Sequence, residues 1–217
     1  MSDARSIGVS PRGLAAATAA LAAGRLVVYP TETFYGLGAH ALLPRAVHAV
    51  AALKERAGEK AKPISVIVAD RAMTARLVAR LPRAAEDLMA RFWPGPLTLV
   101  LPARADLPPE LAAGSGRIGV RVSSHPVARA LAAALGAPIT ATSANRAGAP
   151  PACDAATARE AFGDAVDVYL DGGALAGGSG STVLVVDDDA ARVVRAGAVS
   201  IESLRGVLGA FPLVTPS

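Results

Sequence analysis

Short apolar runs that favour β-strands alternate along this chain with helix-forming segments, and this alternation limits its possible folds more than any other feature. The expected strands are residues 26–29, 64–68, 97–101, 118–122, 139–141, 166–170, 183–186 and 192–194. The expected helices are residues 11–23, 44–56, 71–80, 84–92, 126–135, 155–162 and 201–208. Such alternation is typical of α/β proteins, in which helices cover the faces of a sheet.

Capping residues support the positions of these helices. A Ser or Asp before a helix accepts a hydrogen bond from its first backbone amides, and such residues stand at five expected starts: Ser10, Asp70, Ser124, Asp154 and Ser200. The last two expected strands flank residues 187–191, a segment that suits a hairpin loop. A hairpin requires antiparallel neighbours, so we expect a sheet of mixed strand direction.

The size and composition suit one α/β domain spanning residues 1–217. Alanine dominates the 52% of hydrophobic residues, and no run approaches the roughly 18 apolar residues that span a bilayer, so no membrane segment is expected. The single cysteine, Cys153, excludes an intramolecular disulfide and favours a cytoplasmic location. The net charge of +4 suits anionic ligands such as nucleotides or RNA, although solubility explains such an excess equally well.

Two short polar segments, far apart in the chain, form the strongest candidate for a phosphate site. Lys54 and Arg56 close an expected helix, and Ser143 and Asn145 follow the apolar run 138–141. Two cations with a hydroxyl and an amide can neutralise and hydrogen-bond phosphate oxygens during nucleotidyl transfer, where positioning and electrostatics carry most of the catalysis. Basic residues in a last helical turn also favour the helix dipole, and Lys54 and Arg56 taken alone fit that simpler explanation better.

Three further residues are candidates for holding a small polar substrate. Thr31 lies in a turn after an expected buried strand, where its hydroxyl either contacts a ligand or caps the turn. Arg121 lies within an apolar strand and needs an anion, which is either a substrate carboxylate or a structural Asp or Glu. Ser181 ends the glycine-rich stretch 172–181, which either closes over a ligand or simply leads into a hairpin.

Several other motifs do not indicate chemistry. The glycine-rich stretch 172–181 is not a P-loop, since no Lys follows its last glycine pair and a strand comes next. His40 and His48 lack the spacing of metal ligands, so no metal site is expected. His125 fits a helix start better than a Ser/His nucleophile pair, and Trp93 is expected in the core.

Taken in order, these segments resemble the YrdC family of threonylcarbamoyl-AMP synthases. The similarity covers residues 24–204 through the motifs YPTETFYGLG, KER, KPISVIV, WPGPLTLVL, GVRV followed by HP, TSAN, DGG, STV and RAG. The family's Lys-x-Arg and Ser-x-Asn signatures fall on residues 54–56 and 143–145. Each motif is unremarkable alone, but so many in the same order are hard to obtain by chance.

The resemblance implies an α/β fold with a twisted, open, mixed sheet and flanking helices around a large electropositive cavity. The catalytic residues that it implies are Lys54, Arg56, Ser143 and Asn145. The implied L-threonine contacts are Thr31, Arg121, Ser143 and Ser181, with Arg121 at the carboxylate. The implied nucleotide contacts are Lys54, Arg117, Asn145 and Arg195.

The reaction implied by the resemblance is a nucleotidyl transfer. L-threonine, bicarbonate (or CO2) and ATP give L-threonylcarbamoyl-AMP and pyrophosphate, and the product serves threonylcarbamoyladenosine (t6A) modification of tRNA. Proteins that pass the threonylcarbamoyl group onward are implied partners, and contact with tRNA is a further expectation. Because the sequence holds no carboxylate cluster for a dedicated cage, Mg2+ is expected to arrive with the phosphates of ATP.

Some positions depart from the family pattern. Ala57 replaces a common proline, residues 57–62 form a longer connection, and Gly180 replaces an acid before Ser-Thr-Val. The chain ends 20 residues after Gly197, as in the single-domain form of the family.

Two alternatives to the synthase are kept. One is a non-catalytic protein that binds double-stranded RNA, which predicts salt-dependent RNA binding without ATP turnover. The other is a carbamoyl-transfer module of hydrogenase maturation proteins, but those modules accompany zinc-finger-like cysteines that this sequence lacks.

Overall fold

The computed structural model describes residues 5–56, 62–146 and 148–215, and these form twelve strands, seven α-helices and two short 3-10 helices. The expected α/β class and the mixed strand direction are confirmed. The described strands are divided between two sheets, where the resemblance led us to expect a single open sheet.

Each sheet contains both parallel and antiparallel neighbours. The five-stranded sheet has the order β1 (Arg5–Gly8), β9 (Val168–Asp171), β2 (Val27–Pro30), β3 (Tyr35–Gly38) and β8 (Thr142–Ser143). The seven-stranded sheet has the order β12 (Leu213–Val214), β11 (Ala191–Arg195), β10 (Thr182–Val186), β5 (Leu97–Pro102), β6 (Arg117–Arg121), β4 (Val66–Ile67) and β7 (Ile139–Thr140). The expected hairpin is confirmed, since β10 and β11 are antiparallel neighbours in sequence.

The two sheets meet where β3, β7 and β8 come together. β3 pairs antiparallel with β8, and beyond β3 the bridge between His40 and Ile139 continues the same register. The pairing of β3 with β8 ends at Leu37, and the next residue toward β7, Ala141, donates its amide proton to the carbonyl of Ser65 instead. The segment 139–143 therefore contributes β7 to one sheet and β8 to the other, and the fold has two sheets in place of the single sheet that was expected.

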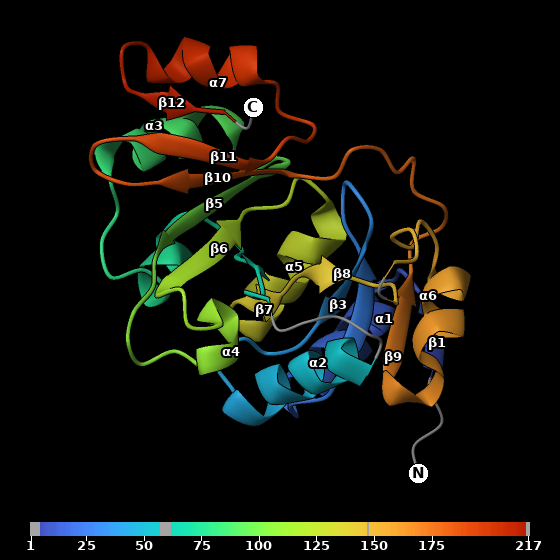
Figure 1. Cartoon of the computed structure of the whole chain (residues 1–217). Coiled ribbons are helices and arrows are strands. Elements are labelled where there is room, and N and C mark those ends of the chain that lie inside the picture. The colour runs from blue at the N-terminus through green and yellow to red at the C-terminus, as the bar shows by residue number, and fades with distance from the viewer. Residues whose placement is uncertain (1–4, 57–61, 147, 216–217) are drawn as a thin grey trace.

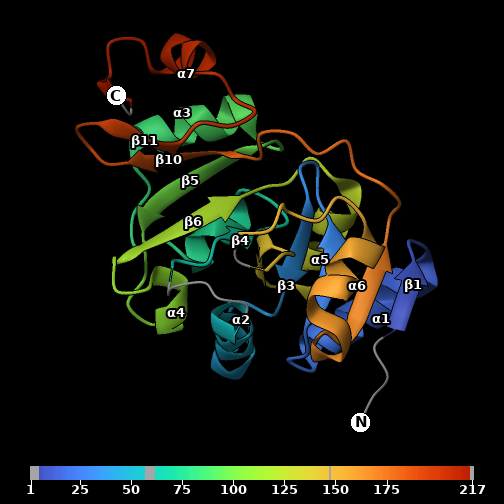
Figure 2. The same ribbon diagram turned by 45° about the vertical axis from the view of Figure 1, so that its right-hand side comes forward.

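Helices cover both sheets. α1 (Pro11–Ala22) packs against α5 (Pro126–Leu135), and α2 (Pro44–Arg56) contacts the short α4 (Pro109–Ala112). Figures 1 and 2 both show α3 (Arg83–Phe92) and α7 (Ile201–Leu208) together beside β10 and β11. α6 (Ala155–Phe162) lies against β9. The 3-10 helices are Ala72–Arg76 and Gly163–Ala165.

Three expected caps are confirmed by hydrogen bonds from the third residue of each helix. The side chains of Ser10, Asp154 and Ser200 accept the amide protons at 3.0, 2.7 and 3.1 Å. The cap expected at Ser124 is wrong. His125 takes that position, because its Nδ1 accepts the amide proton of Val127 at 3.3 Å.

The α-helix expected at residues 71–80 is also wrong. Only the 3-10 turn Ala72–Arg76 forms, although Asp70 still accepts the amide proton of Met73 at 2.8 Å. The chain leaves helical geometry because Leu77 and Val78 are buried and Val78 bridges Ala103 beyond the end of β5. Contacts with this distant strand therefore override a sequence that suits a helix.

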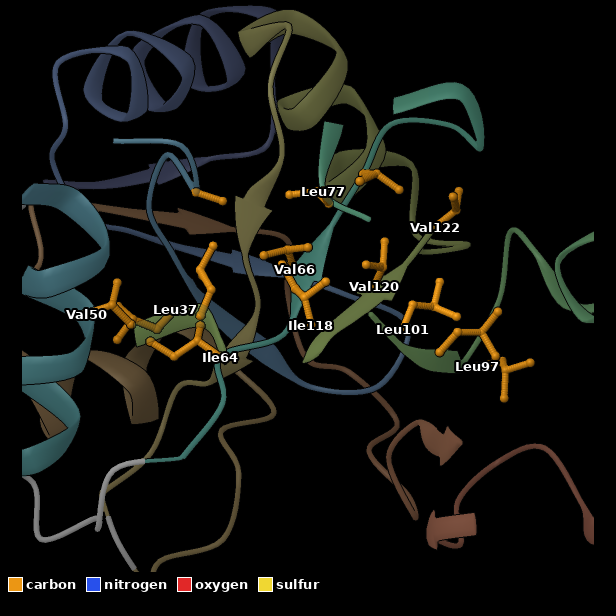
Figure 3. Packing of buried hydrophobic residues seen from close by; sticks show 14 of the residues in the cluster. Leu37, Val50, Ile64, Val66, Leu77, Leu97, Leu101, Ile118, Val120 and Val122 are labelled. Atoms are coloured by element: carbon orange, nitrogen blue, oxygen red, sulfur yellow. The ribbon is translucent and has the colours of Figure 1, made fainter. Parts of the chain in front are cut away.

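The larger of two core clusters lies on one face of the seven-stranded sheet and extends to the helices, and a smaller cluster includes Ile67, Ile139 and residues of α5. Val66 of β4 and Ile118 and Val120 of β6 are among the buried side chains of the larger cluster (Figure 3). Trp93 is buried as expected, and its indole donates to the carbonyl of Leu97 at 2.7 Å. Because successive residues of a strand face opposite ways, this packing leaves the alternate residues of β4, β5 and β6 on the other face.

Candidate functional site

A pocket of about 420 Å³ lies over the face of the seven-stranded sheet opposite the larger core cluster. Its walls come from the turn before β3, the segment after β7, and the end of the glycine-rich loop that precedes β10. Among the lining residues are five predicted from the sequence: Thr31, Arg121, Ser143, Ser181 and Arg195. The fold therefore brings together side chains from five separate segments of the chain.

Strand register explains the polar floor of this pocket. Val100 of β5 pairs with Gly119 of β6, so that Thr98 and Arg121 come opposite each other two residues farther along the same register. On its other side Arg121 pairs with Ile67 of β4. Directly paired residues share a face, and alternate residues of one strand return to it. The polar floor is lined by Ser65, just before β4, by Thr98 of β5 and by Arg121 of β6, and Gly119 lies between Ser65 and Thr98.

Arg121 has an anionic partner within the protein. Its guanidinium donates to one carboxylate oxygen of Glu32 at 2.5 Å, and the hydroxyl of Ser123 donates to the other oxygen. The side chains of Arg121 and Glu32 are only 8% and 14% exposed, so the pair is largely removed from solvent. The sequence predicted either a substrate carboxylate or a structural acidic residue as the partner of Arg121, and the structure shows the acidic residue, Glu32. A substrate carboxylate would have to share the guanidinium of Arg121 with Glu32.

The hydroxyl of Thr31 is engaged within its own turn. It donates to the carbonyl of Phe34 at 2.7 Å and accepts the amide protons of Thr33 and Phe34 at 3.2 and 3.3 Å. Thr31 is also buried, although it lines the pocket. These bonds agree with the turn-capping interpretation, and contact of Thr31 with a substrate stays a prediction.

Ser181 and Arg195 form a second polar group at the pocket wall. Arg195 donates to the carbonyl and the hydroxyl of Ser181 at 2.7 and 3.0 Å, and the Ser181 hydroxyl lies 3.0 Å from that of Thr98. Burial, together with the nearby charge of Arg121, lowers the pKa of Arg195 from its ordinary value. Two guanidinium groups therefore serve one pocket, with the carboxylate of Glu32 balancing one of them.

Gly197 allows this arrangement. A Cβ atom at this position would lie 2.5 Å from backbone atoms of Ser181 and Thr182, so the two segments approach closely only because residue 197 has no side chain.

The glycine-rich loop is anchored at its start by Tyr35. The Tyr35 hydroxyl donates to the carbonyl of Gly173 at 2.7 Å and accepts the amide proton of Gly172 at 2.9 Å. Burial raises the pKa of this phenol, which stays protonated and able to donate. As expected, residues 172–181 contain no regular secondary structure, and the last four of them line the pocket.

Lys54 and the Ser-x-Asn segment are brought together as the sequence predicted. Lys54 is only 6% exposed, and its ammonium donates to the backbone carbonyls of Ser143 and Asn145 at 3.1 and 2.7 Å. The hydroxyl of Ser143 donates to the side-chain oxygen of Asn145 at 2.5 Å. Lys54 therefore fixes the turn that presents Ser143, a structural task that the sequence did not indicate.

Lys54 lines a second pocket, also of about 420 Å³, that includes Lys62 and Glu110. The two pockets share Pro63 and Thr142 in their linings and are therefore adjacent. Arg56 ends α2, but the position of its side chain lies outside the described part of the chain. The same holds for residues 57–61, including Ala57, which the sequence marked as departing from the family.

Arg117 is not brought to either of these two pockets. It lies at the opposite end of β6 from Arg121, about 13 Å away for four residues of extended strand. There it donates to Asp187 at 2.6 Å, in the loop between β10 and β11. A nucleotide contact by Arg117 stays a prediction that this placement does not favour.

Sequence reasoning missed Glu32, the partner of Arg121, and two polar residues that line the first pocket, Ser65 and Thr98. Glu32 lies within the YPTETFYGLG motif, and the need of Arg121 for an anion was a usable signal for it. Ser65 and Thr98 lie in apolar strands, where a polar residue at every second position would have indicated a second, wetter face.

Within the described residues, no group of three or more His, Cys, Asp or Glu side chains could hold a metal, and no helix is long and apolar enough to cross a membrane.

A concave pocket on which a few polar groups converge, here two arginines and several hydroxyls, is the default candidate for a ligand-binding site. Residues 19–197 match the family model described as Telomere recombination, the model of the Sua5, YciO and YrdC proteins. This chain belongs to that family.

Two relatives and one solved structure give the extent of the similarity. A Chromohalobacter salexigens protein named threonylcarbamoyl-AMP synthase is 42% identical over 159 residues, covering 73% of this chain and 84% of that protein. A Bacillus subtilis protein of the same name is 38% identical over 197 residues, covering 90% of this chain and 56% of that protein. The structure of Pyrococcus abyssi Sua5 complexed with L-threonine has a TM-score of 0.90 and 33% identity, and the match covers 96% of this chain and 62% of that one.

Proposed function

We propose that this protein is a threonylcarbamoyl-AMP synthase. It would convert L-threonine, bicarbonate (or CO2) and ATP into L-threonylcarbamoyl-AMP and pyrophosphate, for t6A modification of tRNA. The observation that carries the proposal is the convergence of Arg121, Ser143, Ser181 and Arg195 on one pocket. Support also comes from relatives named threonylcarbamoyl-AMP synthase and from the L-threonine complex of a protein with the same fold.

The proposed chemistry has two steps. The amino nitrogen of threonine forms a bond to the carbon of CO2 and loses a proton, which gives a carbamate. A carbamate oxygen then attacks the α-phosphorus of ATP while the bond to the bridging oxygen breaks, and pyrophosphate leaves with that oxygen and its electron pair. No covalent protein intermediate is required, so the contribution of the protein is positioning and electrostatic stabilisation.

Arg121 would orient the threonine carboxylate in this scheme. Its guanidinium has five N–H donors, so the bond to Glu32 leaves others for a substrate. Ser181 and Arg195 would complete the polar wall, and Thr31 would support the turn on the opposite side.

Ser143 and Asn145 would hydrogen-bond near the reacting phosphate. Lys54 would contribute mainly by holding their turn and by its charge, and Arg56 is proposed as a further cation. Mg2+ would enter with ATP, because the described residues offer it no carboxylate cage.

The test is pyrophosphate release by purified protein with ATP, Mg2+ and bicarbonate, comparing L-threonine with no amino acid. Release that depends on threonine and on bicarbonate is the expected result. If a folded preparation releases none, the synthase proposal is rejected. Salt-dependent binding of double-stranded RNA by the same preparation would then favour the non-catalytic alternative.

A further inference from the structure

One hydroxyl on the floor of the first pocket has no task in the fold. Ser65 precedes β4, is half-buried and lines the pocket. Its backbone carbonyl accepts the amide proton of Ala141 at 2.7 Å, but no described residue hydrogen-bonds its hydroxyl. The neighbouring floor hydroxyl, Thr98, is instead bonded to Ser181. A hydroxyl that faces a pocket and is not used by the protein is available to a ligand.

The absence of a side chain at Gly119 makes room for the hydroxyl of Ser65. A Cβ atom at residue 119 would lie 2.5 Å from Ser65 Oγ and 3.3 Å from the Thr98 methyl group. No positive φ requires glycine at this position, so close approach by these side chains is the reason for it. The bare backbone of Gly119 leaves room for the hydroxyl of Ser65 at the place that a Cβ atom of residue 119 would otherwise crowd.

The spacing of these groups suits a β-hydroxy amino acid. Ser65 and Arg121 occupy diagonal positions on neighbouring strands and the same face, which places their side-chain origins roughly 7 Å apart. Threonine carries its carboxylate and its hydroxyl on adjacent carbon atoms. A ligand whose carboxylate meets the end of Arg121 can therefore direct its hydroxyl to Ser65.

We propose that Ser65, whose hydroxyl lies against the backbone of Gly119, hydrogen-bonds the side-chain hydroxyl of the substrate. This bond would select a hydroxyl-bearing amino acid over an isostere such as valine. This inference rests on the proposed function and adds to it the group that reads the side chain. A pocket that relies on shape alone separates threonine from valine poorly, whereas a polar partner discriminates against the analogue that leaves it unpaired.

The experiment compares Ser65→Ala with the wild type on three amino acids. We measure kcat/KM for pyrophosphate release and the calorimetric Kd with L-threonine, L-serine and L-valine. The values for threonine and serine should both become about tenfold worse, the loss of one hydrogen bond, while those for valine should not worsen and should improve if the unpaired hydroxyl was what excluded it. An equal change for all three amino acids, or no change for any, would overturn the proposal.

Two more variants keep this result interpretable. Gly119→Ala should displace the hydroxyl and lower the preference for threonine over valine, but it should lower it no further when Ser65→Ala is already present. Ser6→Ala removes an exposed hydroxyl on β1 and should change nothing. If the wild type releases no pyrophosphate, the proposed function fails, and the three Kd values alone then decide whether Ser65 reads a hydroxyl. Absence of any amino-acid binding counts against Ser65.

Discussion

Arg121 and Arg117 stand at opposite ends of the same strand and on the same face, yet their surroundings differ. At one end, Arg121 and Glu32 are 8% and 14% exposed, and Arg121 lines the first pocket. At the other end, Arg117 and Asp187 are 31% and 32% exposed and lie by a hairpin loop. The same pair of charges therefore meets a dry environment at one end and a wet one at the other.

This difference indicates which cation is built for function. A buried ion pair costs desolvation energy, so it is a poor device for stability alone and a good one for holding a side chain in one orientation. A half-exposed pair costs little and contributes little. We therefore expect perturbations at the Arg121 end to affect both folding and substrate binding, and those at the Arg117 end to have small effects on stability.

The largest effect is expected at Arg121. Arg121→Met leaves the carboxylate of Glu32 buried without its cation, which should lower the free energy of unfolding by about 3 to 5 kcal/mol. Urea denaturation measures this loss. The double variant Glu32→Gln with Arg121→Met removes both charges and should recover most of the stability, but no activity. Recovery of activity in the double variant would show that Arg121 serves the fold alone.

Lys54 extends the comparison to a buried cation that donates hydrogen bonds to two backbone carbonyls. Lys54→Met removes two charge-assisted hydrogen bonds that hold the turn of Ser143 and Asn145, so stability should fall by about 2 to 4 kcal/mol, and turnover should fall as well. Denaturation and pyrophosphate release measured on the same sample separate the two. A loss of turnover with unchanged stability would instead mean that Lys54 acts mainly on phosphate, as the sequence alone suggested.

The fold was predictable wherever local pattern and tertiary structure agree. Strands with apolar runs and helices with strong caps, such as α1 and α6, lie where the sequence placed them. The segment 71–80 was not predictable, because its conformation follows from burial against the end of β5. β3 was missed because it contains Gly36 and Gly38, which disfavour a strand and are needed to make room for Tyr29.

The site was predictable in its members but only partly in its geometry. Motif order identified Arg121, Ser181 and Arg195, and the structure places them around one pocket. The partner Glu32 and the distant position of Arg117 could not be read from spacing, because both depend on how β6 is aligned with segments far away in the chain. Strand register is set by the packing of distant segments against each other, and the order of motifs along the sequence carries no information on that packing.

His125 lies near Glu32, at the buried end of β6 where Arg121 and Glu32 form their ion pair, so the pH dependence of stability reports on this end. Burial lowers the pKa of His125, although the charge of Glu32 opposes this shift. In the unfolded chain the pKa of His125 is near 6.5. Between that pH and the lower pKa of the folded protein, the unfolded state therefore binds more protons than the folded state. The stabilisation is complete above pH 6.5 and is lost as the pH falls through 6.5 toward the lower folded pKa.

The variant His125→Asn keeps a capping side chain but does not titrate. Its melting temperature should fall less than that of the wild type between pH 7.5 and pH 5.5. Equal losses in the two proteins would mean that His125 titrates in the folded protein as it does in the unfolded chain.

The smallest effect is expected at Arg117. Arg117→Ala breaks a pair that is about one-third exposed, so the free energy of unfolding should fall by about 1 kcal/mol or less. The melting temperature should respond accordingly, and more weakly in high salt. The KM for ATP is measured on the same variant. A large rise in that KM would restore the nucleotide role that the family resemblance implies for Arg117.

The most direct test of the central claim is a calorimetric titration of L-threonine into the wild type and into the folded double variant Glu32→Gln with Arg121→Met. If the pocket at the buried end of β6 binds the substrate through Arg121, the wild type binds threonine and the double variant does not. Equal Kd values in the two proteins would contradict the account and place the amino-acid site elsewhere.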